Sequence, residues 1–233
     1  MEGGRRVVPY DRLVSLGVAG AVLLCLAQSI GVIRTEQAVA PLIRQLGVLS
    51  LLAERNYPLS GPSLLQAGTD SLPPRGLLSS ANMKVLAAGA ENDPVLRSRL
   101  LDAARTDALQ ATATRPIWGE AWTMVAFSTA QRRGERDAET RKAFERSYAD
   151  APYQRNAGAW RVAYAFRNWS DLSPETRSRS VAEAVWLARI DKSLRDRVFA
   201  MARQSDAFVP LLTEWRRSRL GDADYRNRAG SAP

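Results

Sequence analysis

Two pairs of carboxylates are the residues whose types and spacing could support catalysis in this sequence. Asp107 precedes Glu120 by 13 positions, and Asp171 precedes Glu175 by four. Two carboxyl groups can act as general acid and general base, as they do in the hydrolysis of a glycosidic bond. Each residue also fits an ordinary place at a helix start or on a solvated helix face, which is the more common role. The two pairs leave a glycan-cleaving enzyme as an alternative hypothesis but do not favour it.

Other catalytic residue types are scarce. The chain has no histidine, a single cysteine (Cys25) and three lysines, which are Lys84, Lys142 and Lys192. Histidine is the commonest general base and metal ligand, and the usual partner of a serine or cysteine nucleophile. The sequence also contains no phosphate-binding glycine loop, dinucleotide fingerprint or metal-ligand motif. We therefore predict no catalytic residue, no cofactor site and no metal site.

Arginine and aromatic residues interleave between positions 153 and 169. On the first helix of a stacked helical hairpin, such side chains could line the concave face that these arrays use for binding. In the alternative interpretation they are solvated arginines whose aliphatic stems cover the aromatic rings. The predicted binding face consists of Tyr153, Arg155, Arg161, Tyr164, Arg167 and Trp169.

A long apolar segment near the N-terminus must position everything that follows it. Leu13–Ile33 contains 21 residues and no charge. As a helix rising about 1.5 Å per residue it reaches about 30 Å, the thickness of the hydrocarbon core of a bilayer. Arg5, Arg6 and Arg12 precede it, so the positive-inside rule places residues 1–12 in the cytoplasm. We predict one transmembrane helix with the main domain on the opposite side.

A cleaved signal peptide and a buried helix of a soluble domain are the alternatives for this segment. The apolar part of a signal peptide is usually about 7–15 residues, which is shorter than this run. A buried helix can be apolar on all sides, but it would not need the charge asymmetry. Cys25 follows Val22, Leu23 and Leu24, whereas a lipoprotein requires a small residue before its cysteine. We interpret Cys25 as a membrane residue.

The composition of the rest of the chain changes along the sequence and divides it into four segments. Residues 34–57 continue with helical periodicity and are predicted to form a membrane-proximal helix, which Pro41 would kink or begin. Residues 58–75 are rich in Pro, Gly and Ser and are predicted to be a linker or an ordered loop. Residues 76–220 are predicted to be a helical-repeat domain, and the polar residues 221–233 a disordered tail.

Helices without strands are expected in the main domain, because no stretch alternates apolar and polar residues for more than a few positions. Asp93 with Pro94, and Ser173 with Pro174, predict two helix starts. The pattern that follows Asp137 places four inward-facing residues on one helix, namely Ala143, Phe144, Ser147 and Tyr148.

Two segments resemble each other. Glu120–Phe127 and Gly158–Phe166 share a tryptophan followed by small and aromatic residues, and Trp122 and Trp160 are 38 positions apart. Helical-hairpin repeats have a period of about 34 residues. One hairpin cannot bury its apolar face alone, so neighbouring hairpins stack. We predict degenerate repeats in which these tryptophans belong to the core.

This layout resembles small membrane-anchored tetratricopeptide-like proteins of proteobacterial cell-envelope loci, some of which serve exopolysaccharide synthesis and export. The resemblance covers the order of the segments and roughly Pro94–Asp191. It implies an all-α fold, with a single N-terminal transmembrane helix followed by stacked helical hairpins. It also implies a protein of the bacterial inner membrane, with a cytoplasmic N-terminus and a periplasmic main domain.

Composition and layout together predict a non-catalytic scaffold or assembly factor. Lys and Arg number 33 against 24 Asp and Glu, which gives a net charge of +9 carried almost entirely by arginine. Arginine suits acidic partners, so an acidic polysaccharide is a possible ligand beside an envelope protein partner and the membrane itself. The charge is dispersed among acids, which argues against nucleic acid. A cytoplasm-facing adaptor with inverted topology is the remaining alternative.

Overall fold

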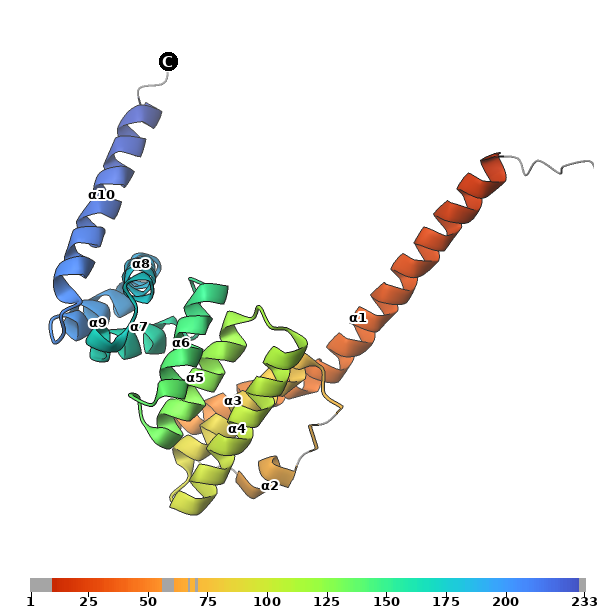
Figure 1. Cartoon of the computed structure of the whole chain (residues 1–233), viewed down its shortest axis with the longest axis horizontal. Coiled ribbons are helices and arrows are strands. Elements are labelled where there is room, and N and C mark those ends of the chain that lie inside the picture. The colour runs from red at the N-terminus through yellow and green to blue at the C-terminus, as the bar shows by residue number, and fades with distance from the viewer. Residues whose placement is uncertain (1–9, 56–60, 67, 70, 231–233) are drawn as a thin grey trace, which may run out of the picture.

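The computed structural model describes residues 10–55, 61–66, 68–69 and 71–230, and in these ranges its elements are helical, with no strand (Figure 1). The predicted all-α fold is confirmed for this part of the chain. Most of the predicted cytoplasmic segment 1–12 and part of the predicted linker 58–75 lie outside the described residues.

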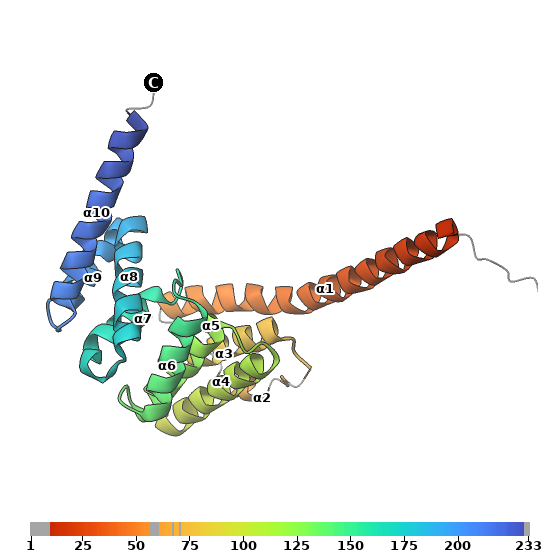
Figure 2. The same ribbon diagram turned by 45° about the horizontal axis from the view of Figure 1, so that its top comes forward.

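The longest helix, α1 (Tyr10–Glu54), joins the predicted membrane segment and the predicted membrane-proximal helix into one continuous element (Figure 2). Pro41 lies inside α1 without ending it. By length and composition, α1 is the one helix in the described part of the chain that could cross a membrane, and little of its apolar stretch is buried. Signal sequences and core helices of soluble proteins can share that length and composition, but a core helix is mostly buried.

The second half of α1 packs against α3 (Pro74–Ala90). Val39 of α1 is completely buried, and Glu36 forms an ion pair with Arg75 at the start of α3. A Cβ atom on Gly76 would lie 3.4 Å from Cδ1 of Leu42. The two helices therefore approach closely just after the apolar segment ends.

The short helix α2 (Gly61–Gln66) packs against α3 and α4 (Pro94–Thr114). Asp93 caps α4, because its carboxylate accepts a hydrogen bond of 2.9 Å from the backbone N–H of Val95. The helix start predicted at this position is confirmed.

A buried ion pair joins α3 to α4. The distance from Lys84 Nζ to Asp107 Oδ2 is 2.6 Å, and both side chains are almost inaccessible to solvent. Charged groups are rarely buried unless they are paired, so this contact fixes how the two helices face each other.

The next two helices also pack side by side, and their bounds are α5 (Gly119–Arg133) and α6 (Ala138–Asp150). The turn between them uses Gly134 with a φ of +105°, a conformation that favours glycine. At the start of α5, a Cβ on Gly119 would lie only 2.4 Å from Cβ of Ala151. The chain that follows α6 can therefore cross the start of α5 only because residue 119 has no side chain.

The last elements are α7 (Gly158–Arg167), the 3-10 turn η1 (Trp169–Asp171), α8 (Pro174–Ile190), α9 (Lys192–Ala202) and α10 (Phe208–Gly230). Ser173 caps α8 by accepting a hydrogen bond from the Thr176 N–H, which confirms the predicted start. Asp191 caps α9 in the same way through Ser193. In Figure 1 these helices lie at the opposite end of the domain from the free end of α1.

Two segments in this part of the chain differ from what the sequence pattern suggests. The arginine and aromatic segment 153–169, expected on one helix, is α-helical only over Gly158–Arg167. Gln154 lies in the connection before this helix, where its backbone N–H donates to Glu183. Helix α10 continues to Gly230, into the segment 221–233 for which a disordered tail is predicted. Residues 231–233 lie outside the described part of the chain.

Aromatic side chains fill the core between the α5/α6 pair and the α7/α8 pair. The Phe144 ring lies 5.2 Å from Tyr148, 6.1 Å from Trp160 and 4.2 Å from Tyr164, measured between ring centroids. The four residues predicted to face inward from α6 are all buried, which confirms that prediction. Trp122 and Trp160 are partly buried and pack against this core, as predicted.

Candidate functional site

The predicted arginine and aromatic face does not form one surface. Arg161 is completely buried and Tyr164 is 1% exposed, so neither can line an open binding face. The sequence-based assignment of these two residues to a surface is therefore corrected. Their helical spacing was compatible with either side of α7, and the apolar neighbours on the same side placed them in the core.

Arg161 instead belongs to a buried network with Glu183 and Tyr148. Its Nε lies 3.3 Å from Glu183 Oε2, and its guanidinium lies 3.6 Å from the centroid of the Tyr148 ring. The Tyr148 hydroxyl donates to Glu183 Oε2 (2.6 Å), and the Gln154 backbone N–H donates to Oε1 (2.8 Å). Arg161 also donates to the carbonyl of Ala151 (2.9 Å). The network ties α6, α7 and α8 together.

The buried position of Glu183 changes its acidity. Burial raises the pKa of this carboxyl group to about 7, because lost hydration outweighs the opposing effects of Arg161, Tyr148 and the Gln154 N–H. Burial also raises the pKa of the Tyr148 hydroxyl well above its usual value, so this group stays protonated. The cluster could hold a proton near neutral pH, but it is enclosed by the core and reaches no cavity described below.

Raising the pH should weaken the fold through Glu183. Its folded-state pKa of about 7 exceeds the ordinary value of 4.5, so between these values the folded chain binds more protons than the unfolded chain. The contribution of this group to the free energy of unfolding is fully present below pH 4.5. It decreases by up to about 3 kcal/mol as the pH rises through 7. Urea unfolding of wild type and Glu183→Gln at several pH values measures this. A stability difference between the two that does not change with pH would contradict the assignment.

A second set of predicted face residues joins neighbouring helix pairs. Arg167 donates from Nε and from one terminal nitrogen to the carboxylate of Glu135, at 3.0 and 2.5 Å. Asn168 donates to the same carboxylate, and the Tyr164 hydroxyl donates to the Glu135 carbonyl (2.7 Å). The Arg167 and Asn168 hydrogen bonds hold the pKa of Glu135 below its usual value, with Arg167 the larger cause. The end of α7 is thereby fixed to the turn between α5 and α6.

The remaining members of the predicted face lie apart. Tyr153 is 49% exposed in the connection between α6 and α7, where its ring lies 5.5 Å from Trp186. Arg155 is exposed in the same connection. Trp169 is half-buried beside Phe166. Of the six residues, only Tyr153 and Arg155 share an exposed segment.

In each carboxylate pair considered for catalysis, the two residues lie in different surroundings. Asp107 is buried and bound to Lys84, whereas Glu120 lies on the exposed side of α5. Glu175 forms an ion pair with Arg179 one helical turn away, and Asp171 is exposed in η1. These contacts are those of structural and surface charges. Among the described residues, no group of three or more Cys, Asp or Glu side chains could hold a metal ion.

An apolar groove runs along α3, α5 and α7 and is the first candidate functional site. Its central cavity has a volume of about 360 Å³ and is bounded by Leu46 of α1 at one edge. A neighbouring cavity of about 240 Å³ shares Val85 and Phe127 with it, and another of about 280 Å³ shares Trp160 and continues to α9. We define the apolar groove by the residues Leu46, Leu78, Val85, Met124, Phe127, Trp160 and Met201.

The groove is built by side chains that the core leaves partly uncovered. Phe127 and Trp160 meet edge to face, with their ring centroids 5.2 Å apart and an angle of 72° between the rings. Met124 lies one turn before Phe127 on the same side of α5 and lines the same cavity. Methionine and aromatic side chains can adapt to the apolar face of a bound segment. The groove thus offers a surface for apolar contact rather than for a reaction.

A larger cavity of about 630 Å³ opens on the other side of α5, where Trp122 lies over apolar residues of α5 and α6. Its rim is charged, but the charges are engaged with one another. Arg179 pairs with Glu175, Arg146 pairs with Asp150, and Glu145 accepts from the backbone N–H of Ser173. These contacts engage most of the charged groups of the rim, which makes it a weaker candidate for a partner.

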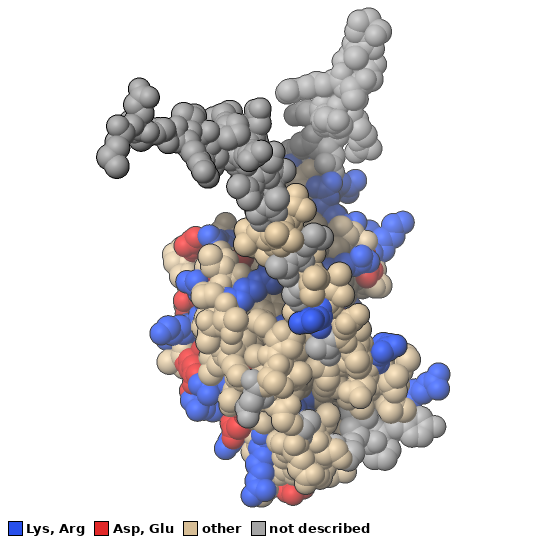
Figure 3. All heavy atoms as spheres, turned by 90° about the vertical axis from the view of Figure 1, so that its right-hand side faces the viewer, with Lys and Arg blue, Asp and Glu red and all other residues tan. Residues whose placement is uncertain are grey.

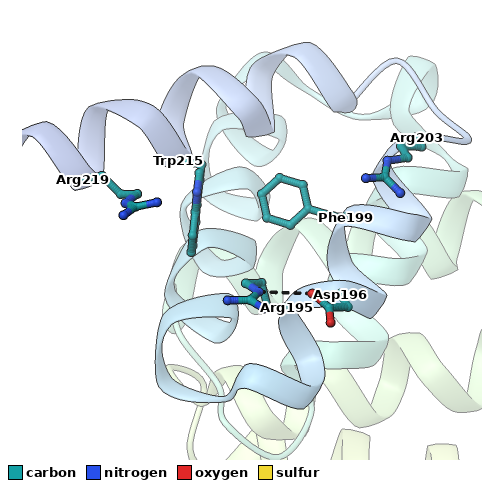
Figure 4. A pocket seen from close by; sticks show the side chains of 6 residues that line it. All are labelled: Arg195, Asp196, Phe199, Arg203, Trp215 and Arg219. Carbon is teal, nitrogen blue, oxygen red and sulfur yellow. Dashed lines mark hydrogen bonds and ion pairs between the residues drawn. The ribbon is translucent and has the colours of Figure 1, made fainter.

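A pocket between α9 and α10 is the second candidate site (Figure 4). Three arginine side chains surround the rings of Phe199 and Trp215, which meet edge to face at 5.5 Å. The pocket has a volume of about 400 Å³, and its arginines are Arg195, Arg203 and Arg219. Asp196 is the acidic residue in the lining, and it pairs with Arg195. We call this site the arginine pocket.

Comparison with protein-family models, curated proteins and solved structures found no match to this chain. Its candidate sites therefore rest on its own geometry.

Sequence reasoning missed both candidate sites. It noted Trp122 and Trp160 as equivalent positions of a repeat, but Trp122 lines the charged-rim cavity and Trp160 lines the apolar groove. The groove residues Met124 and Phe127 lie one turn apart in the sequence, and that spacing was the available signal. The arginine pocket joins residues from two helices about 20 positions apart, which no local pattern reveals.

Proposed function

We propose that this protein is a non-catalytic scaffold that α1 anchors in a membrane and that binds a partner protein through the apolar groove. The packing of the described helices after α1 supports an array of stacked, tetratricopeptide-like hairpins, because α3 packs on α4, α5 on α6 and α7 on α8. In addition α3 contacts α5 and α7 contacts α9. Phe127 of α5 meets Trp160 of α7, so the first helices of successive pairs line one groove. The observation that carries the proposal is the groove along that face.

The partner that fits the groove is an amphipathic helix with an apolar stripe. Helices dock into apolar grooves through anchors spaced three or four residues apart. The groove residues on α3, α5 and α7 are apolar and partly exposed. The charged residues Glu120, Arg97 and Arg197 line the same cavities along the length of the groove. Apolar anchors would supply affinity, and the flanking charges would select the orientation of the helix.

Photo-crosslinking from Met124 tests the groove. A photoreactive amino acid at this position in the full chain, activated in native membranes, should give a discrete protein adduct. Adding Phe127→Lys should reduce this adduct about tenfold or more, because a charge placed in an apolar interface loses its hydration. The measurement is the adduct intensity after electrophoresis, normalised to the amount of folded protein.

Ile190 provides the matched control. It is an apolar residue with 47% exposure at the end of α8 and outside the groove. The same photoreactive residue at position 190 should give no discrete adduct. Equal adducts at 124 and 190, or an adduct at 124 that Phe127→Lys leaves unchanged, would refute the groove as the binding site.

The charge before the apolar segment and the resemblance in layout support a proposal for the side of the membrane on which the main domain lies. Arg5, Arg6 and Arg12 precede the apolar segment, and the positive-inside rule then favours a cytoplasmic N-terminus. We propose that the main domain lies in the periplasm of a bacterial inner membrane and that the scaffold serves polysaccharide synthesis or export. The pathway rests on the resemblance in layout alone. The inverted, cytoplasm-facing adaptor remains the alternative topology.

The arginine pocket favours a second binding function for an acidic ligand. Three guanidinium groups can pair with carboxylates or phosphates, and Trp215 offers a ring against which a sugar or other flat group can pack. An acidic polysaccharide combines these features. In this proposal, the groove holds a protein partner while the pocket engages the polymer.

A further inference from the structure

The start of α3 lies close to the point where α1 would leave the membrane. Glu36 of α1 follows the last residue of the apolar segment, Ile33, by three positions, or about 4.5 Å along the helix. This residue pairs with Arg75, the second residue of α3. From there α3 runs alongside α1, because the α3 residues Leu78 and Val85 line a cavity with Leu46. The N-terminal end of α3 is therefore the membrane-proximal end of the domain.

The loop between α4 and α5 lies at this same end. Leu77 near the start of α3 forms a buried cluster with Ala111 at the end of α4 and Ala121 at the start of α5. Trp118, the last residue of the loop, packs against this cluster. The loop residues Arg115–Trp118 are thus placed beside the α1 exit by the core of the domain and not by a flexible tether.

The side chains of this loop are unusual for a loop in water. Ile117 is 72% exposed, and no other large apolar residue is as exposed among those whose side chains the structure describes. The Arg115 guanidinium lies 5.1 Å from the centroid of the Trp118 ring. Exposed apolar residues next to Trp and Arg are typical of segments at a membrane–water interface.

The whole membrane-proximal end fits a lipid surface. Figure 3 looks onto the end of the molecule from which the first half of α1 projects, and it shows a broad uncharged surface with many Lys and Arg side chains around it and fewer Asp and Glu side chains, which lie mostly along the left edge. Arg34, Arg75 and Arg115 are exposed at this end. Arg75 pairs with Glu36, which leaves Arg34 and Arg115 as the arginines best suited to meet lipid phosphates. An uncharged area bordered mainly by Lys and Arg side chains matches the chemistry of headgroups above an apolar layer.

We propose that the loop Arg115–Trp118 is a second membrane contact, with Ile117 inserted among the lipid headgroups and Arg115 bound to lipid phosphate. The proposal rests on the proposed anchoring of the protein by α1. The contact would fix the tilt of the domain, because two separated points would then touch the bilayer. It would also hold the opening of the apolar groove at a set height above the membrane.

Fluorescence quenching by labelled lipids tests this contact in the full-length protein. Cys25 is the only cysteine of the chain, so Cys25→Ser followed by Ile117→Cys allows one environment-sensitive dye at position 117. The protein is reconstituted in vesicles of phosphatidylethanolamine and phosphatidylglycerol that carry a spin label at headgroup depth. We expect quenching at 117 about twofold or more above that of a dye on Val209→Cys, which has 70% exposure at the distant start of α10.

A third position separates this proposal from the anchor proposal. A dye on Leu23→Cys, within the apolar segment, should be quenched by a spin label placed deep in the acyl chains. Quenching at 23 with no excess at 117 over 209 would overturn the loop contact and leave the anchor standing. No quenching at 23 would overturn both. Replacing Arg115 with glutamate should lower the quenching at 117 in the anionic vesicles toward the value at 209, and an unchanged value would overturn the phosphate contact.

Discussion

Replacing Glu183 with alanine is expected to lower the free energy of unfolding by about 3–5 kcal/mol. The substitution leaves the Arg161 guanidinium buried and charged without its carboxylate partner, and it also removes the acceptor of the Tyr148 hydroxyl. Both side chains of the ion pair are completely buried, so water cannot replace the lost contacts. Urea unfolding of the detergent-solubilised protein, followed by tryptophan fluorescence, measures the change.

Glu175→Ala is the matched control for this prediction. Glu175 lies on the same helix and also pairs with an arginine, Arg179, but its side chain is 73% exposed. An exposed pair one helical turn apart contributes less than about 1 kcal/mol. The double variant Arg161→Met with Glu183→Leu should recover much of the loss, since no unpaired charge remains. Similar losses for Glu183→Ala and Glu175→Ala would show that the buried network does not hold α6, α7 and α8 together.

Removing residues 1–33 is expected to shift the protein almost completely from the membrane fraction to the soluble fraction. The deletion takes away the eleven Leu, Ile and Val residues between positions 13 and 33, each worth about 0.3–0.6 kcal/mol toward insertion at the centre of a span. It retains Glu36 and Val39, which hold the second half of α1 against α3. The helical content of the domain should therefore persist, as circular dichroism can check.

The same deletion discriminates between the anchor and the loop contact. The loop Arg115–Trp118 remains in the shortened chain and should give only weak, salt-sensitive binding to anionic vesicles. A shortened chain that stays in the membrane fraction as firmly as the full chain would contradict the anchor as the main attachment. A shortened chain that loses its helical signal would show that the first half of α1 supports the fold of the domain.

The helical fold was predictable from local signals in the sequence. Asp93 and Ser173 stand before prolines at helix starts, and both cap helices in the structure. The inward positions on α6 followed from 3.6-residue periodicity, and Phe144 and Tyr148 are buried as that periodicity requires. These features depend on residues within one or two turns of each other, so a single sequence contains them.

The predicted binding face was less predictable because burial depends on distant residues. Arg161 looks like a surface residue in its own helix, and only Glu183 on another helix explains why it can be buried. Arg167 likewise finds its partner Glu135 across a turn 32 positions away. The arginine-rich composition suggested solvated charges, whereas part of that charge joins helix pairs.

Alkaline extraction of membranes that contain the full-length protein is the most direct test of the anchored scaffold. High pH strips peripheral proteins from the bilayer and leaves transmembrane proteins in the pellet. We expect the full chain to stay in the pellet after extraction, while the chain that lacks residues 1–33 appears in the supernatant. Release of the full chain into the supernatant would contradict a membrane-spanning α1 and, with it, the placement of the groove above a membrane.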